Sequence, residues 1–239
     1  MSVLRRFALV VSIVFGGSLA LGVAAIAAGG GLAPGDYVFT SVSANAEFGL
    51  AKGGPSDQPS IGVFVNRGLN SYEPEHPKGP STVTNSTMVQ LSIFTPTGGI
   101  GGCWVINPSD FTVSNDLRTA RLHTTLTAAN VCPGLGVPVT GKSGAAPIGA
   151  AGGGSIALPI TLDVTWTGLG ATSVERDRGT FSCLNYSVGS TNVLHLSGAT
   201  ASATVSGLNG TFATDVAGVD STDSHIDING TPPPNCPGV

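Results

Sequence analysis

The stretch that decides the fold is IALPITLDVTW, residues 156–166. Its aliphatic and aromatic side chains fall on every second residue, and the positions between them carry alanine, proline, threonine or aspartate. A period of two places all the large apolar side chains on one face of a strand, whereas a helix needs a period of 3.6. The segment therefore predicts a β-strand with one buried face, and Pro159 favours a strand start or a sheet edge.

Weaker versions of the same alternation recur along the chain, at residues 38–48, 61–65, 89–94, 120–126 and 193–205. A more polar strand is expected at residues 173–184, around Glu175-Arg176-Asp177-Arg178. No segment shows the apolar period of a helix of three turns. Strands that recur at short intervals with turn residues between them predict an antiparallel β-sandwich, with a closed up-and-down β-barrel as the alternative.

One turn is predicted in detail. Asn209-Gly210 separates an alternating segment at residues 199–205 from another at residues 212–216. Asn-Gly is the preferred two-residue type I′ turn, because both residues must adopt a positive φ. A tight hairpin is therefore expected here. Residues 134–155 and 71–80, by contrast, are rich in glycine, alanine or proline and are expected to be loops.

The N-terminus has the build of a secretory signal peptide. Arg5 and Arg6 precede a charge-free apolar run, and Ala25-Ile26-Ala27 supplies a small-residue cleavage site. We expect residues 1–27 to be the signal peptide, 28–35 a linker and 36–239 a single extracytoplasmic all-β domain. Because the apolar run is long enough to cross a bilayer, an uncleaved segment that anchors the protein in the membrane is the competing interpretation. The expected location is secreted or in the cell envelope.

Composition narrows the class of partner. The formal net charge is -4, and the few lysines and arginines are scattered. No basic stripe is present to neutralise a run of phosphates, which argues against nucleic acid as a partner. Valine, isoleucine and threonine are abundant while charged residues make up 10% of the chain, and this balance favours a folded β-domain over disorder.

The four cysteines, Cys103, Cys132, Cys183 and Cys236, form an even set in a chain that is expected to be exported. An oxidising compartment favours two disulfides, each contributing about 2 to 4 kcal/mol. Three pairings are possible, and we predict Cys103 with Cys132 and Cys183 with Cys236. No pair has the short spacing of a zinc site.

Two polar segments are candidate sites. Asp223, His225 and Asp227 share one face if their segment is a strand, and such carboxylates could hold calcium, although a solvated outer face is the favoured interpretation of the pattern. Glu73, Glu75 and His76 lie in a proline-rich segment where they could bind a metal or act as acid and base. Calcium is the only cofactor that the sequence suggests.

A phosphate-binding pattern, GVPVTGKS at residues 136–143, matches the spacing G-x-x-x-x-G-K-S. That loop works only between a buried strand and the N-terminus of a helix, and Gly144-Ala145-Ala146-Pro147 is a poor helix start. We interpret the match as a coincidence within a glycine-rich loop.

No catalytic constellation stands out from these motifs. The sequence therefore favours an exported, non-catalytic β-domain with a binding or envelope-structural role, whose partner is an unidentified extracellular protein or glycan. The alternative is an enzyme of the isomerase or cyclase type that uses the enclosed apolar cavity of a closed barrel. The decisive feature would be an enclosed space of at least about 300 Å³ between the strands.

Overall fold

The computed structural model describes residues 34–49, 60–74, 82–95, 98–132, 158–170 and 172–231. This part of the chain is almost entirely β-structure, which confirms the predicted all-β class. Two short 3₁₀ helices, η1 (Pro108–Asp110) and η2 (Ala128–Asn130), interrupt the strands. The strands are β1 (Gly35–Phe48), β2 (Ser60–Pro74), β3 (Thr82–Thr95), β4 (Gly98–Val105), β5 (Phe111–Val113), β6 (Thr119–Leu126), β7 (Ile160–Gly168), β8 (Ser173–Cys183), β9 (Tyr186–Val205) and β10 (Phe212–Asn229).

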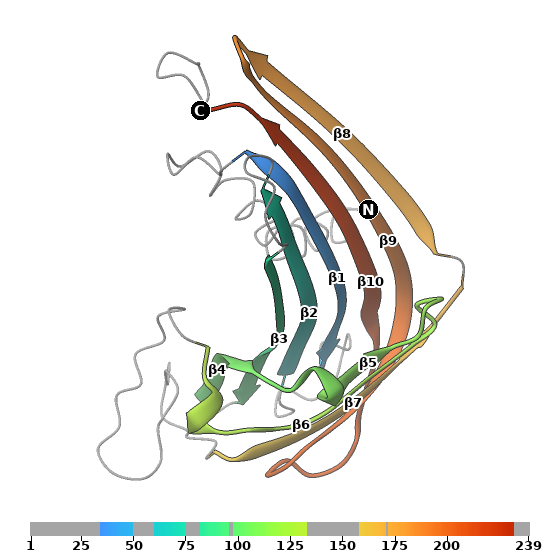
Figure 1. Cartoon of the computed structure of the whole chain (residues 1–239). Helices are drawn as coiled ribbons and strands as arrows, with labels where there is room; N and C mark the ends of the chain where they lie inside the picture. The colour runs from blue at the N-terminus through green and yellow to red at the C-terminus, as the bar shows by residue number, and fades with distance from the viewer. Residues whose placement is uncertain are drawn as a thin grey trace.

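All ten strands belong to one antiparallel sheet, in the order β4-β3-β2-β1-β10-β9-β7-β6-β5, with β8 also paired to β9. The sheet is not closed into a barrel, so the barrel alternative is not the observed architecture. Its strands are long and strongly bent (Figure 1). Two partners share one edge of β9, because β8 pairs with residues 186–196 and β7 pairs with residues 199–205.

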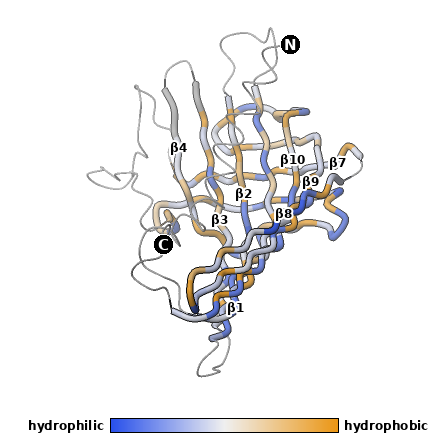
Figure 2. The backbone as a smooth tube through the Cα atoms, turned by 90° about the horizontal axis from the view of Figure 1, so that it is seen from above, coloured by the Kyte–Doolittle hydropathy of each residue, from blue (hydrophilic) through white to orange (hydrophobic). Residues whose placement is uncertain are grey.

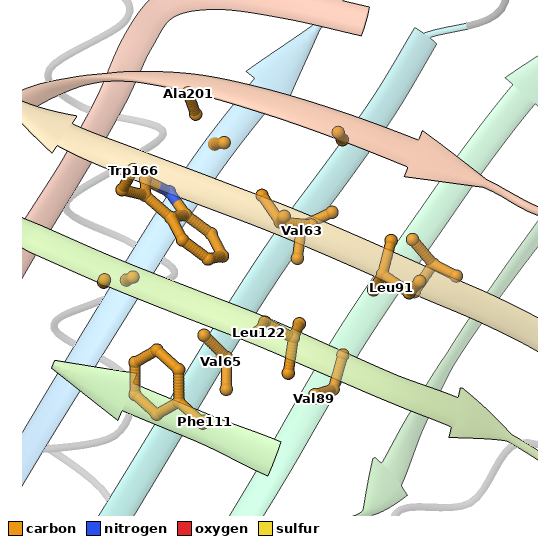
Figure 3. Packing of buried hydrophobic residues seen from close by; sticks show 14 of the residues in the cluster. Val63, Val65, Val89, Leu91, Phe111, Leu122, Trp166 and Ala201 are labelled. Carbon is orange, nitrogen blue, oxygen red and sulfur yellow. The ribbon is translucent and has the colours of Figure 1, made fainter. Parts of the chain in front are cut away.

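The main core forms where the sheet folds over itself. Strands β5, β6 and β7 cross over β1, β2 and β3, and the apolar side chains of both layers meet between them (Figure 3). Trp166 and Phe111 come from the layer of β5, β6 and β7, and Val63 and Leu91 come from the layer of β1, β2 and β3. All four side chains are at most 3% exposed. A single sheet therefore supplies two packed layers, the arrangement that a sandwich obtains from two sheets.

The alternation predicted at residues 156–166 is confirmed from Ile160 onward, while residues 156 and 157 lie outside the described residues. Ile160, Leu162, Val164 and Trp166 are fully buried, and the threonines between them are exposed. Pro159 precedes the first residue of β7, which agrees with its interpretation as a strand start. Hydrophobic and hydrophilic residues also alternate along parts of the other strands (Figure 2).

The bend in β9 and β10 has a local cause. Gly198 and Gly218 face each other across the two strands, and β10 carries one extra residue between Thr214 and Ala217. A β-bulge sharpens the twist of a strand, and facing glycines remove the side chains that would resist a tight bend. The sheet therefore turns at this point, and the distal parts of its strands extend away from the core.

We call this distal part the wing. It consists of β8 with residues 186–197 of β9, 219–229 of β10, 35–42 of β1, 67–74 of β2 and 82–87 of β3. One face of the wing continues the face that forms the main core, and we call it the inner face. The opposite, outer face carries a second apolar cluster of Tyr37, Tyr186, Ile226 and Ile228, with Tyr37 stacked on Tyr72 at a ring separation of 4.5 Å.

The hairpin between β9 and β10 is confirmed, but the predicted two-residue turn is wrong. The last paired residues are Ala203 and Phe212, so the connection is longer than Asn209-Gly210. Gly207 and Gly210 have positive φ values while Asn209 does not, which excludes a type I′ turn at Asn209-Gly210. The reason is that β9 runs on along β7, where Ser206 donates its backbone N–H to the carbonyl of Thr161 at 2.9 Å.

Other boundaries also moved. The segment predicted at residues 212–216 and the segment that holds Asp223 and Asp227 are parts of the single strand β10. The expected loop at residues 71–80 is wrong for residues 71–74, because β2 extends through these polar residues up to Pro74. The sequence pattern did not reveal these extensions, because they carry polar residues on both faces. Backbone pairing with neighbouring strands stabilises them instead of the burial of one apolar face. The expected loop at residues 134–155 and the phosphate-binding pattern at residues 136–143 lie outside the described residues.

Candidate functional site

A pocket of about 360 Å³ lies on the inner face of the wing. Its lining comes from four neighbouring strands, β10, β1, β2 and β3, and consists of Thr40, Ser41, Val42, Arg67, Gly68, Leu69, Asn85, Ser221 and Asp223. The volume falls within the range of about 300 to 1,000 Å³ that is usual for small-molecule sites. The pocket is therefore large enough to hold a small ligand.

Strand register explains how residues from distant parts of the sequence meet here. Val42 of β1 lies between Arg67 of β2 and Ser221 of β10, and this row is the one closest to the core. The next row runs from Asn85 through Leu69 and Thr40 to Asp223. Directly opposed residues in an antiparallel pair point to the same face, so both rows present their side chains on the inner face.

Arg67 is held in place at the edge of this pocket. Its Nη1 donates a hydrogen bond to the backbone carbonyl of Phe111 at 3.1 Å, which links the wing to the folded-over layer. A guanidinium has five N–H donors, so this bond leaves other donors for a ligand. Thr87, the cross-strand neighbour of Arg67, is buried, and its hydroxyl has no hydrogen-bond partner among the described residues. Arg67 is thus a fixed cation next to an unsatisfied polar atom.

Asp223 is the negatively charged member of the pocket, and it is exposed. The sequence had grouped it with His225 and Asp227, and all three do project from the same face of β10. The structure gives the other two different partners, because His225 Nε2 lies 3.3 Å from Asp36 Oδ1 and Asp227 accepts a hydrogen bond from the Asn229 amide at 3.0 Å. Within the described ranges, no group of three or more histidine, cysteine or acidic side chains is arranged to hold a metal ion.

The second candidate site predicted from the sequence, Glu73 with Glu75 and His76, begins at the end of β2. Glu73 is exposed and pairs across the strands with Asp36, which in turn pairs with Asp227. Glu75 and His76 lie outside the described residues. The row of three carboxylates was not foreseen, because the sequence does not reveal which distant strands become neighbours.

Two of the cysteines form the predicted disulfide. Cys103 and Cys132 are bonded to each other, with their Cα atoms 5.3 Å apart, and they join β4 to the residue that follows the bridge at Val131. Cys183 at the end of β8 is also disulfide-bonded. Cys236, its predicted partner, lies outside the described residues.

Sequence reasoning missed a buried acid on the outer face of the wing. Asp220 of β10 accepts a hydrogen bond from the Ser43 hydroxyl at 2.5 Å, across the β1–β10 pair. Burial raises the pKa of Asp220 from 3.8 to about 6, and the Ser43 hydrogen bond offsets only part of this effect. No spacing in the sequence marks this residue, since its surroundings come from other strands.

A histidine–carboxylate pair was also missed. His123 Nδ1 lies 3.1 Å from Asp163 Oδ2 on the solvent face of β6 and β7, and Arg121 Nη2 approaches the same oxygen at 3.4 Å. The group is surrounded by exposed threonines rather than by a pocket. Its geometry is that of surface ion pairs, which contribute little to stability.

Comparison with known proteins adds no assignment to this geometry. No protein-family model matches the chain, and no curated protein or solved structure matches it significantly. In the described part of the chain, no helix is both long enough and apolar enough to cross a membrane.

Proposed function

We propose that the protein is an exported, non-catalytic binding domain that holds a short saccharide in the inner-face pocket. The observation that supports this most directly is the composition of the pocket. A cation, a carboxylate, an amide and hydroxyls converge on one space, with two aliphatic side chains between them.

The chemistry of these groups suits a saccharide. Asp223 can accept hydrogen bonds from sugar hydroxyls, Arg67 can donate them, and Asn85 can do both. Val42 and Leu69 can pack against the C–H groups of a sugar ring. Bonds to charged partners are roughly twice as strong as neutral ones, so the Arg67 and Asp223 contacts should dominate the affinity.

Export is supported by two features. The apolar N-terminal segment has the order of a signal peptide, and the disulfide between Cys103 and Cys132 requires an oxidising compartment to persist. If the protein is exported as proposed, its pocket lies in the same compartment as extracellular glycans.

The alternative, an enzyme built on a closed barrel, is less well supported because the sheet is not closed. It required an enclosed apolar cavity, yet the sheet is open and the space between its layers is filled by side chains such as Trp104, Trp166, Phe48 and Phe111. The inner-face pocket differs from such a cavity, because its lining is largely polar.

The test is a titration of the purified protein with a panel of neutral mono- and disaccharides, followed by calorimetry and by amide chemical shifts. We expect at least one sugar to shift the amides around Thr40, Leu69 and Ser221. The Asp223→Asn variant should weaken binding by at least about tenfold, since a hydrogen bond to a charged group contributes about 1.5 to 3 kcal/mol.

A matched control is available on the same strand. Asp227 is exposed on the same face of β10 but lies outside the pocket, so Asp227→Asn should leave the affinity unchanged. The proposal fails if no sugar in the panel binds, or if the two aspartate variants weaken binding equally.

A further inference from the structure

The strand β8 is the exposed edge of the wing. It pairs with β9 on one side, and none of the described strands pairs with its other side. Residues 173–182 are all exposed, which distinguishes β8 from the opposite edge, where β4 is bridged to Val131 and bonded through Cys103. In Figure 1, β8 is the outermost strand of the wing. An unpaired edge of this length is a template for another strand.

Charge is segregated between the two faces of this edge. The register with β9 places Arg176 and Arg178 on the inner face, opposite Val193 and Thr191. Glu175 and Asp177 alternate with them and therefore lie on the outer face. The edge thus presents two cations on one face and two anions on the other.

This distribution disfavours pairing with a second copy of the chain. Two copies of β8 can pair antiparallel through their free sides only about a two-fold axis perpendicular to the sheet, because any other antiparallel operation would use the side of β8 that β9 occupies. Such an axis places residues of the same face opposite each other. An axis at Asp177 opposes Asp177 to itself and Arg176 to Arg178, and an axis at Gly179 opposes the same charges only to uncharged residues. No axis of this kind opposes an acid to a base, because each face of β8 carries charges of one sign. Like charges directly opposite each other destabilise a sheet.

We propose that the β8 edge binds an extended segment of another protein in which acidic and basic residues alternate. An antiparallel strand of this kind places an acid opposite each of Arg176 and Arg178 and a base opposite each of Glu175 and Asp177. Backbone hydrogen bonds supply the affinity in this mode of recognition, and the opposed charges select the sequence. The same four residues that offer a second antiparallel copy no complementary charge therefore define the partner. This surface is separate from the inner-face pocket, so the two proposals fail independently.

The experiment uses two labelled peptides of identical composition, TTEKEKVT and TTEEKKVT, and measures fluorescence anisotropy with the purified protein. Docked antiparallel, the first peptide opposes a complementary charge to each of the four residues. The second groups its charges in blocks and cannot match all four in any register. We expect the alternating peptide to bind at least tenfold more tightly.

A variant of β8 tests the site itself. Arg176→Thr combined with Arg178→Thr removes the cations and keeps a residue type with high strand propensity, so the edge should stay folded. Circular dichroism checks the fold, and the preference for the alternating peptide should fall at least fivefold in this variant.

Hydrogen exchange supplies a readout that charge attraction alone would not change. In the complex, alternate amides of β8, those that do not bond to β9, should become protected. Equal binding of the two peptides, an unchanged preference in the arginine variant, or binding without new protection in β8 would each overturn the proposal.

Discussion

Replacement of Asp220 by asparagine should stabilise the protein at neutral pH. The carboxyl group is partly buried between β1 and β10, and the Ser43 hydroxyl donates a hydrogen bond to it at 2.5 Å. Burial raises the pKa of this group from 3.8 to about 6. An asparagine of nearly the same shape can still accept the Ser43 hydrogen bond and carries no charge to desolvate.

The magnitude follows from proton linkage. One pKa unit corresponds to about 1.4 kcal/mol, so the raised pKa of Asp220 corresponds to about 3 kcal/mol. Because the folded protein binds this proton more tightly than the unfolded chain, the free energy of unfolding decreases as the pH rises from about 4 to about 6. Above this window the full cost of ionisation is present. The variant should therefore be more stable than the parent by about 2 to 3 kcal/mol at pH 7 and equally stable below about pH 4.

The assay is urea denaturation with disulfides intact, followed by tryptophan fluorescence at several pH values between 3.5 and 8. Asp223→Asn is the matched control, because Asp223 lies on the same strand but is exposed on the opposite face. Its effect should stay within about 0.5 kcal/mol at every pH. The reasoning is refuted if Asp220→Asn is neutral or destabilising at pH 7, or if its advantage over the parent does not shrink as the pH falls.

Two further predictions concern the core and the disulfide, and both are measured by urea denaturation at pH 7. Trp166→Phe should cost about 2 to 4 kcal/mol, because the fully buried indole Nε1 donates to the Asn45 carbonyl at 2.8 Å. Trp104→Phe should cost less, since the buried Nε1 of Trp104 has no hydrogen-bond partner in the described part of the chain. Equal losses in the two variants would contradict this account of the hydrogen bond. The double variant Cys103→Ser, Cys132→Ser should lose about 3 to 4 kcal/mol, since the bridge spans 29 residues of sequence, and an unchanged midpoint would contradict the loop-entropy argument.

Strand prediction succeeded where one face of a strand is buried. The alternation around Leu162 and Trp166 identified β7, and weaker alternation located parts of β1, β2, β3, β6 and β9. It failed to show how far β2 and β10 extend, because none of the described residues forms a second layer on the inner face of the wing, and the strands there carry polar residues on both sides. Apolar periodicity reports burial, and it vanishes where burial ends.

The candidate site was only partly foreseen. Asp223 was singled out for its acidic neighbours, yet the structure places it in a pocket with Arg67 and Asn85, which are far away in the sequence. Arg67 acquires its fixed position from the carbonyl of Phe111, on a strand of the other layer. No local pattern could reveal these partners, since strand order across the sheet does not follow the order of the chain.

The amino-acid sequence by itself determined the all-β class and the buried face of its clearest strand, because these depend on residue period. It left three disulfide pairings possible, of which the predicted bond between Cys103 and Cys132 is present in the structure. Only the tertiary structure decided that one open sheet would fold over itself, that a wing would remain with a pocket on its inner face, and that β8 would be left as a charged edge. The physical reason is that these features arise from the bend at Gly198 and Gly218 and from the pairing of strands that lie far apart in the sequence. Such pairing depends on many separate segments at once, and no local stretch of sequence reveals it.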